Sequence, residues 1–192
     1  MSFSYYILYK PYNMLSQFRQ EIEGQVTLAN IDFIFPKDIY PVGRLDADSE
    51  GLLLLTNDKS LNFLLLDPQN AHSRTYYVQV EGAISDESIE KLSKGVEIKI
   101  NGKRYFTQKA KVEKLGEEPD FPPRNPPIRF RQHIPTSWIS VTLTEGKNRQ
   151  VRRMTAAVGF PTLRLVRVQM GKLQLADLQP SEVKWVTRDT IL

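Results

Sequence analysis

Hydrophobic positions along the chain follow a strand-like pattern more often than a helical one. The aromatic and apolar segment Tyr5–Lys10 stops at Pro11, which predicts a strand that runs into a loop. Apolar runs and two-residue alternation predict further strands at 52–55, 75–81, 96–100, 138–143, 163–168, 172–175 and 183–187.

Two helices are predicted from their capping residues. Asp58 precedes a segment with Leu61, Leu64 and Leu65 on one face, so it is expected to cap a helix there. Ser85 precedes a second helix, with Ile89 and Leu92 as its buried side and Gly95 as its end.

A third helix is predicted at 148–158, and its two faces differ in character. Gly159 and Pro161 end it. The inward face carries Val151, Met154, Thr155 and Val158. The opposite face carries Arg149, Arg152 and Arg153, whose guanidinium groups suit forked contacts with phosphate.

A segment rich in proline separates the middle strands from the later ones. Residues 116–136 hold Pro119, Pro122, Pro123, Pro126, Pro127 and Pro135, which donate no hydrogen bond to a sheet and keep the chain extended. We expect a loop there. Because strands outnumber helices and their order is irregular, the fold class is predicted to be α+β with a mainly antiparallel sheet.

Composition excludes several kinds of chemistry. The chain has no cysteine, so disulfides, thiolate metal sites and a cysteine nucleophile are excluded. Purely apolar runs such as 52–55 are far shorter than the ~20 residues of a membrane span. We therefore expect a cytoplasmic protein that does not contact a membrane.

Charge is distributed unevenly along the chain. The net charge is only +4, but residues 1–100 hold 9 basic and 14 acidic side chains, whereas residues 101–192 hold 17 and 8. The second half can therefore form a positive surface that attracts nucleic acid. A solvated basic face without a partner is the alternative.

The acidic loop 43–51 contains Asp46, Asp48 and Glu50 between apolar segments. A calcium loop is one interpretation, but position 5 is Glu50 and position 12 is Asn57 instead of a bidentate glutamate. A hydrolase with paired carboxylates is a second, although the sequence names no partner for Asp46. A solvated acidic turn is the third.

Four ordered motifs resemble those of the pseudouridine synthases of the RsuA and RluB/RluE/RluF group. They are Lys10-Pro11 with Ser16; Gly43-Arg44-Leu45-Asp46 continued through Asp58; Arg74-Thr-Tyr76-x-Val78; and residues 145–154, Glu-Gly-Lys-Asn-Arg-Gln-Val-Arg-Arg-Met. The resemblance spans nearly the whole chain. It favours a pseudouridine synthase active site at the acidic loop over a calcium loop, a hydrolase site and a solvated turn.

The resemblance has two departures and one refinement. Many members begin with an S4 RNA-binding domain, whereas the core-like segment begins almost at residue 1 here, so no S4 domain is expected. Arg74 stands where lysine is common. The loop 126–138 looks most like that of a branch acting on 23S ribosomal RNA.

The resemblance implies a single catalytic domain over 1–192, with a mixed but mainly antiparallel sheet, flanking helices and a central active-site cleft. We expect an N-terminal subdomain of about 1–72 and a C-terminal one of about 73–192. It also implies a monomer, without metal or other cofactor, acting on 23S ribosomal RNA in the large subunit or its precursor.

The resemblance assigns catalytic roles to three residues. Asp46 acts at the ribose as nucleophile or as acceptor of the C2′ proton. Tyr76 stacks on the base, and Lys147 lowers the pKa of Asp46, with Arg149 as the alternative. Expected contacts with a flipped-out nucleotide and its phosphates come from Lys10, Arg44, Arg149, Arg152 and Arg153.

Two rival functions remain open. In a non-catalytic RNA-binding or ribosome-assembly protein, the arginine face would suffice and Asp46 would be incidental. A glycosidase-like hydrolase is the other. Loss of activity on removing the Asp46 charge, with RNA binding retained, distinguishes the isomerase from the binding protein.

Overall fold

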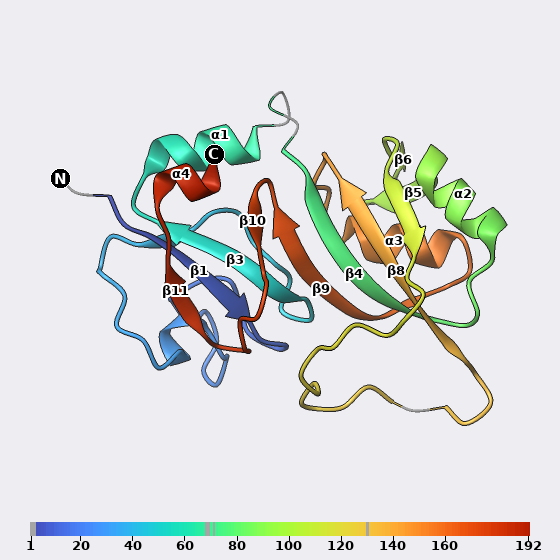
Figure 1. The fold of residues 1–192 in the computed structure, drawn as a ribbon, viewed down its shortest axis with the longest axis horizontal. Coiled ribbons are helices and arrows are strands. Elements are labelled where there is room, and N and C mark those ends of the chain that lie inside the picture. The colour runs from blue at the N-terminus through green and yellow to red at the C-terminus, as the bar shows by residue number, and fades with distance from the viewer. Residues whose placement is uncertain (1–2, 68–69, 71, 130) are drawn as a thin grey trace. The chain divides into compact units, whose positions relative to one another are not determined.

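The computed structural model describes residues 3–67, 70, 72–129 and 131–192 (Figure 1). The chain forms two compact units. The first combines residues 1–72 with Val166–Leu192, and the second is Ser73–Leu165.

The first unit is built on a mixed sheet. Strand β1 lies between β3 and β11 and is antiparallel to both, whereas β3 and β9 run parallel at Glu50 and Gly51. The short strands β2 and β10 pair with β3 and β9. The strands are β1 (Tyr5–Lys10), β2 (Tyr40–Pro41), β3 (Glu50–Thr56), β9 (Thr162–Met170), β10 (Leu173–Gln174) and β11 (Val183–Trp185). Strand β9 belongs to this unit only from Val166 onward.

Strand β3 is the centre of the first unit's core. Every residue from Glu50 to Thr56 is buried, as expected of an apolar run with strand neighbours on both edges. One face packs with Leu8 of β1, Leu28 of the 3-10 helix η1 (Leu28–Asn30) and Ile39. The predicted strand is thus confirmed, and it is longer at both ends.

The first unit has two short helices, α1 and α4, and an ion pair links α4 to the residue that caps α1. Helix α1 (Lys59–Leu66) starts at Asp58, whose side chain accepts a hydrogen bond from Ser60 N, so the predicted cap is confirmed. Arg188, in α4 (Arg188–Ile191), places its Nε 3.6 Å from Asp58 Oδ2.

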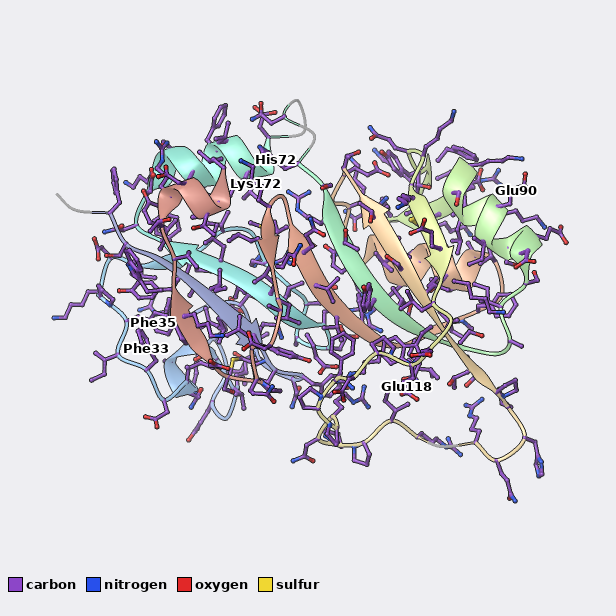
Figure 2. The ribbon with its side chains drawn as sticks, viewed as in Figure 1. Phe33, Phe35, His72, Glu90, Glu118 and Lys172 are labelled. Atoms are coloured by element: carbon purple, nitrogen blue, oxygen red, sulfur yellow. The ribbon has the colours of Figure 1, made fainter. Side chains whose placement is uncertain are left out.

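An aromatic cluster forms below β1 in the long segment before β2. Phe33 and Phe35 have ring centroids 4.7 Å apart, and both contact Tyr6 (Figure 2). Phe35 also packs edge-on against Phe18. These contacts order a segment with little regular structure.

The second unit has an antiparallel sheet with β8 between β4 and β7, and a separate β5–β6 hairpin. Val78 and Val80 of β4 are fully buried, so the predicted alternation is confirmed. The strands are β4 (Arg74–Glu81), β5 (Glu97–Ile100), β6 (Lys103–Phe106), β7 (Lys111–Lys114) and β8 (Thr136–Leu143).

Two helices cover this sheet. Helix α2 (Asp86–Lys94) has Ser85 and Gly95 at its ends, as predicted, and packs against β7. Helix α3 (Gln150–Ala157) buries Val151, Met154 and Thr155 and packs against β5 (Figure 1). The described part of 116–135 forms no helix or strand, as expected from its prolines, and Phe130 lies outside the described residues.

The compact units correct the predicted subdomains. The units also divide after His72, but Val166–Leu192 groups with the first unit instead of the second. The reason is strand pairing between distant segments: β9 joins β3, and β11 joins β1. Strands β2, β6 and β7 were not predicted, because they are short and their local pattern is weak.

Candidate active site

The acidic loop of the first unit is a short turn held by neighbouring backbone. Ser49 N donates to Asp46 O at 3.0 Å, and Asn13 N donates to Ala47 O at 2.7 Å. The buried Ser16 hydroxyl donates to Leu45 O at 2.9 Å and accepts from Leu45 N at 3.0 Å. Both the amide and the carbonyl of Leu45, the residue before Asp46, are therefore held by hydrogen bonds.

Lys10 lies beneath this loop, with no exposed surface. Its Nζ donates to the carbonyl oxygens of Pro11 at 2.9 Å, Met14 at 2.7 Å and Ala47 at 3.4 Å. Burial lowers the pKa of Lys10 to about 7, against the opposing effect of the Glu50, Asp48 and Asp46 carboxylates.

The burial of Lys10 argues against the predicted contact with phosphate. A fully buried ammonium with three backbone acceptors cannot reach RNA on the surface. Lys10 instead ties the end of β1 to the loop that follows Asp46. The sequence did not indicate this burial, because lysine side chains are rarely buried and a surface position was therefore expected.

The other candidates of the first unit surround the same loop. Asp46 is half-buried and Arg44 is exposed. Gly43, with φ +69°, makes the backbone turn that precedes Arg44. Arg167, buried on β9, donates from Nε to Leu52 O at 2.8 Å and thereby links β9 to β3 next to the loop.

A pocket of about 380 Å³ adjoins the acidic loop and was not predicted from the sequence. Ala47, the neighbour of Asp46, forms part of its wall together with Asn13, Leu15 and residues 23–26. The wall residues come from separate parts of the segment 13–47 and have no common motif, so only the fold reveals the pocket.

Tyr76 lies on β4 of the second unit. It is half-buried, packs against the unit's hydrophobic core, and is opposite Val141 in the sheet. Arg74 lies two residues earlier on the same face, and its guanidinium approaches Gly146. Its Nη1 is 3.9 Å from the position that a Cβ atom on Gly146 would occupy. Two of the sequence motifs thus meet in this unit.

The turn that precedes α3 presents basic side chains. Lys147, Asn148 and Arg149 are all exposed. Arg149 stands at the N-cap of α3 in the left-handed region, with φ 51° and no side-chain capping hydrogen bond. The helix therefore begins later than predicted, and its first residue is Gln150.

Arg152 and Arg153 are half-buried, which corrects the expectation that they simply face outward. The Arg153 guanidinium donates to the Asn148 carbonyl and side chain and to the carbonyl of Lys99 on β5. Arg153 is thus partly a structural link between the turn, α3 and the hairpin.

The structure therefore divides the predicted site residues between the two units. Lys10, Arg44 and Asp46 lie together in the first, and Tyr76, Lys147, Arg149, Arg152 and Arg153 lie in the second. Among the described residues, no three His, Asp or Glu side chains gather to hold a metal, so the calcium interpretation gains no support. No helix within the described residues could cross a membrane.

The fold and these sites define an α+β protein with a fixed acidic loop in one unit and a basic turn in the other. The chain belongs to the RNA pseudouridylate synthase family, whose model matches residues 4–157. It is therefore an isomerase that acts on RNA. The predicted family and fold class are confirmed.

Curated relatives cover most of the chain. It is 53% identical to ribosomal large subunit pseudouridine synthase E of Vibrio parahaemolyticus, over 93% of this chain and 71% of the relative. The synthase E of Xanthomonas axonopodis is 48% identical over 91% and 89%. Synthase B of Bacillus subtilis is 34% identical over 95% and 68%.

A solved structure shows the same fold. The crystal structure of a pseudouridylate synthase superposes with a TM-score of 0.80, at 24% identity, over 99% of this chain and 73% of the other.

Proposed function

We propose that the protein converts one uridine of 23S ribosomal RNA, in the large subunit or its precursor, into pseudouridine, and that it does so in the cytoplasm. The similarity to the synthase E relatives over more than nine tenths of the chain carries the proposal. A basic turn before α3 supports an RNA substrate, because exposed Lys147 and Arg149 can meet phosphates.

Asp46 is the proposed catalytic carboxylate. The reaction breaks the N1–C1′ bond, turns the uracil and forms a C5–C1′ bond; C5 loses a proton and N1 gains one, so the atoms balance. Asp46 would attack the ribose or accept the C2′ proton. Either role requires an ionised carboxylate in a fixed position, and the hydrogen bonds at Leu45 and Ala47 restrain its backbone.

The remaining site residues act on the nucleotide. The uridine leaves its stack at a cost of about a few kcal/mol, and Arg44 helps to hold it in the flipped-out position. Tyr76 stacks on the uracil and assists removal of the C5 proton. Lys147 stabilises the ionised form of Asp46 in the RNA complex, while Arg149 and Arg152 contact phosphate.

An RNA-binding protein without catalysis is the rival function. The arginines of the second unit would suffice for it, and the carboxylate of Asp46 would then be dispensable. A single substitution separates the two functions.

We expect Asp46→Asn to abolish pseudouridine formation in single-turnover assays while leaving RNA affinity within about threefold of the parent. The substitution keeps the shape and removes the charge. Asp48→Asn is the matched control, since it removes a second carboxylate from the same loop and should retain activity within about tenfold.

Single-turnover activity of Asp46→Asn within tenfold of the parent would overturn the assignment of Asp46. Mapping pseudouridines in ribosomal RNA from cells lacking the protein tests the substrate separately. One missing large-subunit pseudouridine is expected, and an unchanged map contradicts the proposed substrate.

A further inference from the structure

The exposed turn at 147–149 rests on a buried polar network that begins at Glu145. Glu145 is 8% exposed, and its carboxylate accepts three hydrogen bonds. Oε2 accepts from the Tyr105 hydroxyl at 2.5 Å, and Oε1 accepts from Gln108 N at 2.8 Å and from Gln150 Nε2 at 2.5 Å. These donors come from β6, the segment after it, and α3.

Gln150 carries the network from Glu145 to the turn. While its Nε2 donates to Glu145, its Oε1 accepts from Lys147 N at 2.9 Å. The backbone closes the same turn, because Gln150 N donates to Lys147 O at 3.1 Å. The buried amide of Gln150 thus fixes the backbone of an exposed residue.

Tyr105 also contacts the side chain of Lys147. The Lys147 ammonium lies 5.0 Å from the centre of the Tyr105 ring, within the range of a cation–π contact. Hydrogen bonding to Glu145 and burial raise the pKa of Tyr105 to about 12, so the phenol stays protonated and keeps donating. One residue therefore reaches both the buried carboxylate and the exposed ammonium.

The far end of the turn is held independently. Arg153 Nε donates to Asn148 O at 3.0 Å, and Nη2 donates to Asn148 Oδ1 at 3.2 Å. The backbone is thus held at both ends of the turn, and the side chains of Lys147 and Arg149 are exposed on it.

We propose that Tyr105 and Glu145 are positioning residues that hold the Lys147–Arg149 turn, with the Lys147 ammonium over the Tyr105 ring, in the arrangement that receives RNA. The inference rests on the proposed function for the identity of that ligand. A buried polar network is a costly way to gain stability, whereas it fixes geometry well, which favours a positioning role.

Two substitutions at Tyr105 separate its ring from its hydroxyl. Tyr105→Phe keeps the ring for Lys147 and removes the hydrogen bond to Glu145, whereas Tyr105→Leu removes both. Phe106→Leu is the matched control, because Phe106 lies on the same strand with 65% of its surface exposed.

The first measurement does not depend on activity. The NMR signals of the Lys147 ε-methylene should carry a ring-current shift in the parent, in Tyr105→Phe and in Phe106→Leu, and lose it in Tyr105→Leu. A shift that persists in Tyr105→Leu, or that is absent from the parent, overturns the contact whether or not the protein is a ribosomal RNA synthase.

The second measurement is a double-mutant cycle on RNA affinity. Tyr105→Leu should weaken binding by about two- to fivefold, the effect of a cation–π contact at an exposed site. In a Lys147→Ala background the same change should cost less, because only the part that acts through Glu145 and the turn remains. An equal loss in both backgrounds would show that the Tyr105 ring does not act through Lys147 and would sink the proposal.

Glu145 offers a test by conservative rescue. In Glu145→Gln the amide oxygen can accept from Gln108 and Gln150, and the amide nitrogen can donate to a Tyr105 hydroxyl that has turned to accept. In Glu145→Ala all three contacts vanish. We expect Glu145→Gln to keep RNA affinity within about threefold of the parent and Glu145→Ala to lose about tenfold or more. The single-turnover rate at saturating RNA should also fall further in Glu145→Ala than in Glu145→Gln. If both variants bind RNA like the parent, the network has no positioning role.

Discussion

At the residue scale, the most informative side chain is Lys10. A buried ammonium is costly, and this one is stabilised by three backbone carbonyls and by the nearby carboxylates of the acidic loop. Two of the carbonyls, those of Pro11 and Met14, follow β1, and the third follows Asp46. Lys10 thus couples the stability of the first unit to the geometry of its loop.

Lys10 should make the free energy of unfolding depend on pH. Burial lowers its pKa from 10.5 in the unfolded chain to about 7 in the fold. Between these values the unfolded chain holds a proton that the folded chain has released, so stability rises with pH across this window. Below about pH 7 both forms are protonated, and the contribution of Lys10 is constant at its lowest value.

Denaturant unfolding of the parent and of Lys10→Met, from pH 6 to pH 10, measures this effect. The difference in unfolding free energy, parent minus variant, should be flat below about pH 7 and increase above it. A difference that stays constant over the whole range would show that Lys10 keeps its ordinary pKa. Other titrating groups cancel in the comparison.

At the element scale, the parallel pairing of β3 with β9 connects the C-terminal segment Val166–Leu192 to the N-terminal part of the first unit. Gly51 adopts φ +104° at this pairing, and a Cβ there would lie no more than 3.0 Å from the O, N and C atoms of Arg167. Glycine permits both the backbone conformation and the close approach of the two strands. Gly51 is also the last residue of the acidic loop 43–51.

Gly51→Ala should therefore lower the free energy of unfolding by at least about 2 kcal/mol, because it combines backbone strain with overlap of Arg167. Gly24→Ala is the matched control: Gly24 also has a positive φ, +83°, but no atom lies within 4 Å of its Cβ position. The control should cost about 1 kcal/mol from strain alone. Equal losses in thermal or denaturant unfolding would show that strand proximity at Gly51 is unimportant.

At the scale of the whole molecule, charge is divided between the two units. The first unit holds 9 basic and 12 acidic side chains, and the second holds 17 and 10, so the net charges are −3 and +7. The RNA-attracting charge therefore belongs to the second unit. Part of it is neutralised locally, since Lys91 and Lys94 of α2 pair with Glu87 and Glu90.

The salt dependence of RNA binding should distinguish these basic groups. Arg149→Ala should reduce the slope of log K against log salt by roughly 1 unit, because one phosphate contact is lost. Lys91→Ala, whose ammonium lies 2.7 Å from a Glu87 oxygen, should leave the slope unchanged. A larger change from Lys91 than from Arg149 would place the RNA on α2 instead of on the turn.

The sequence by itself determined most elements and the candidate catalytic loop. Periodicity and capping are local, so β1, β3, β4, the start of α1 and both ends of α2 could be predicted from their own residues. The motif around Asp46 is contiguous, which made it recognisable without a structure.

Only the tertiary structure decided which distant segments meet. The return of Val166–Leu192 to the first unit depends on strand pairing across more than a hundred residues, and no local pattern encodes it. The burial of Lys10 and the contact of Tyr105 with Glu145, 40 residues apart, likewise arise from packing. Local pattern fixes what an element is, whereas long-range contacts decide whether a charged side chain binds a ligand or holds the protein together.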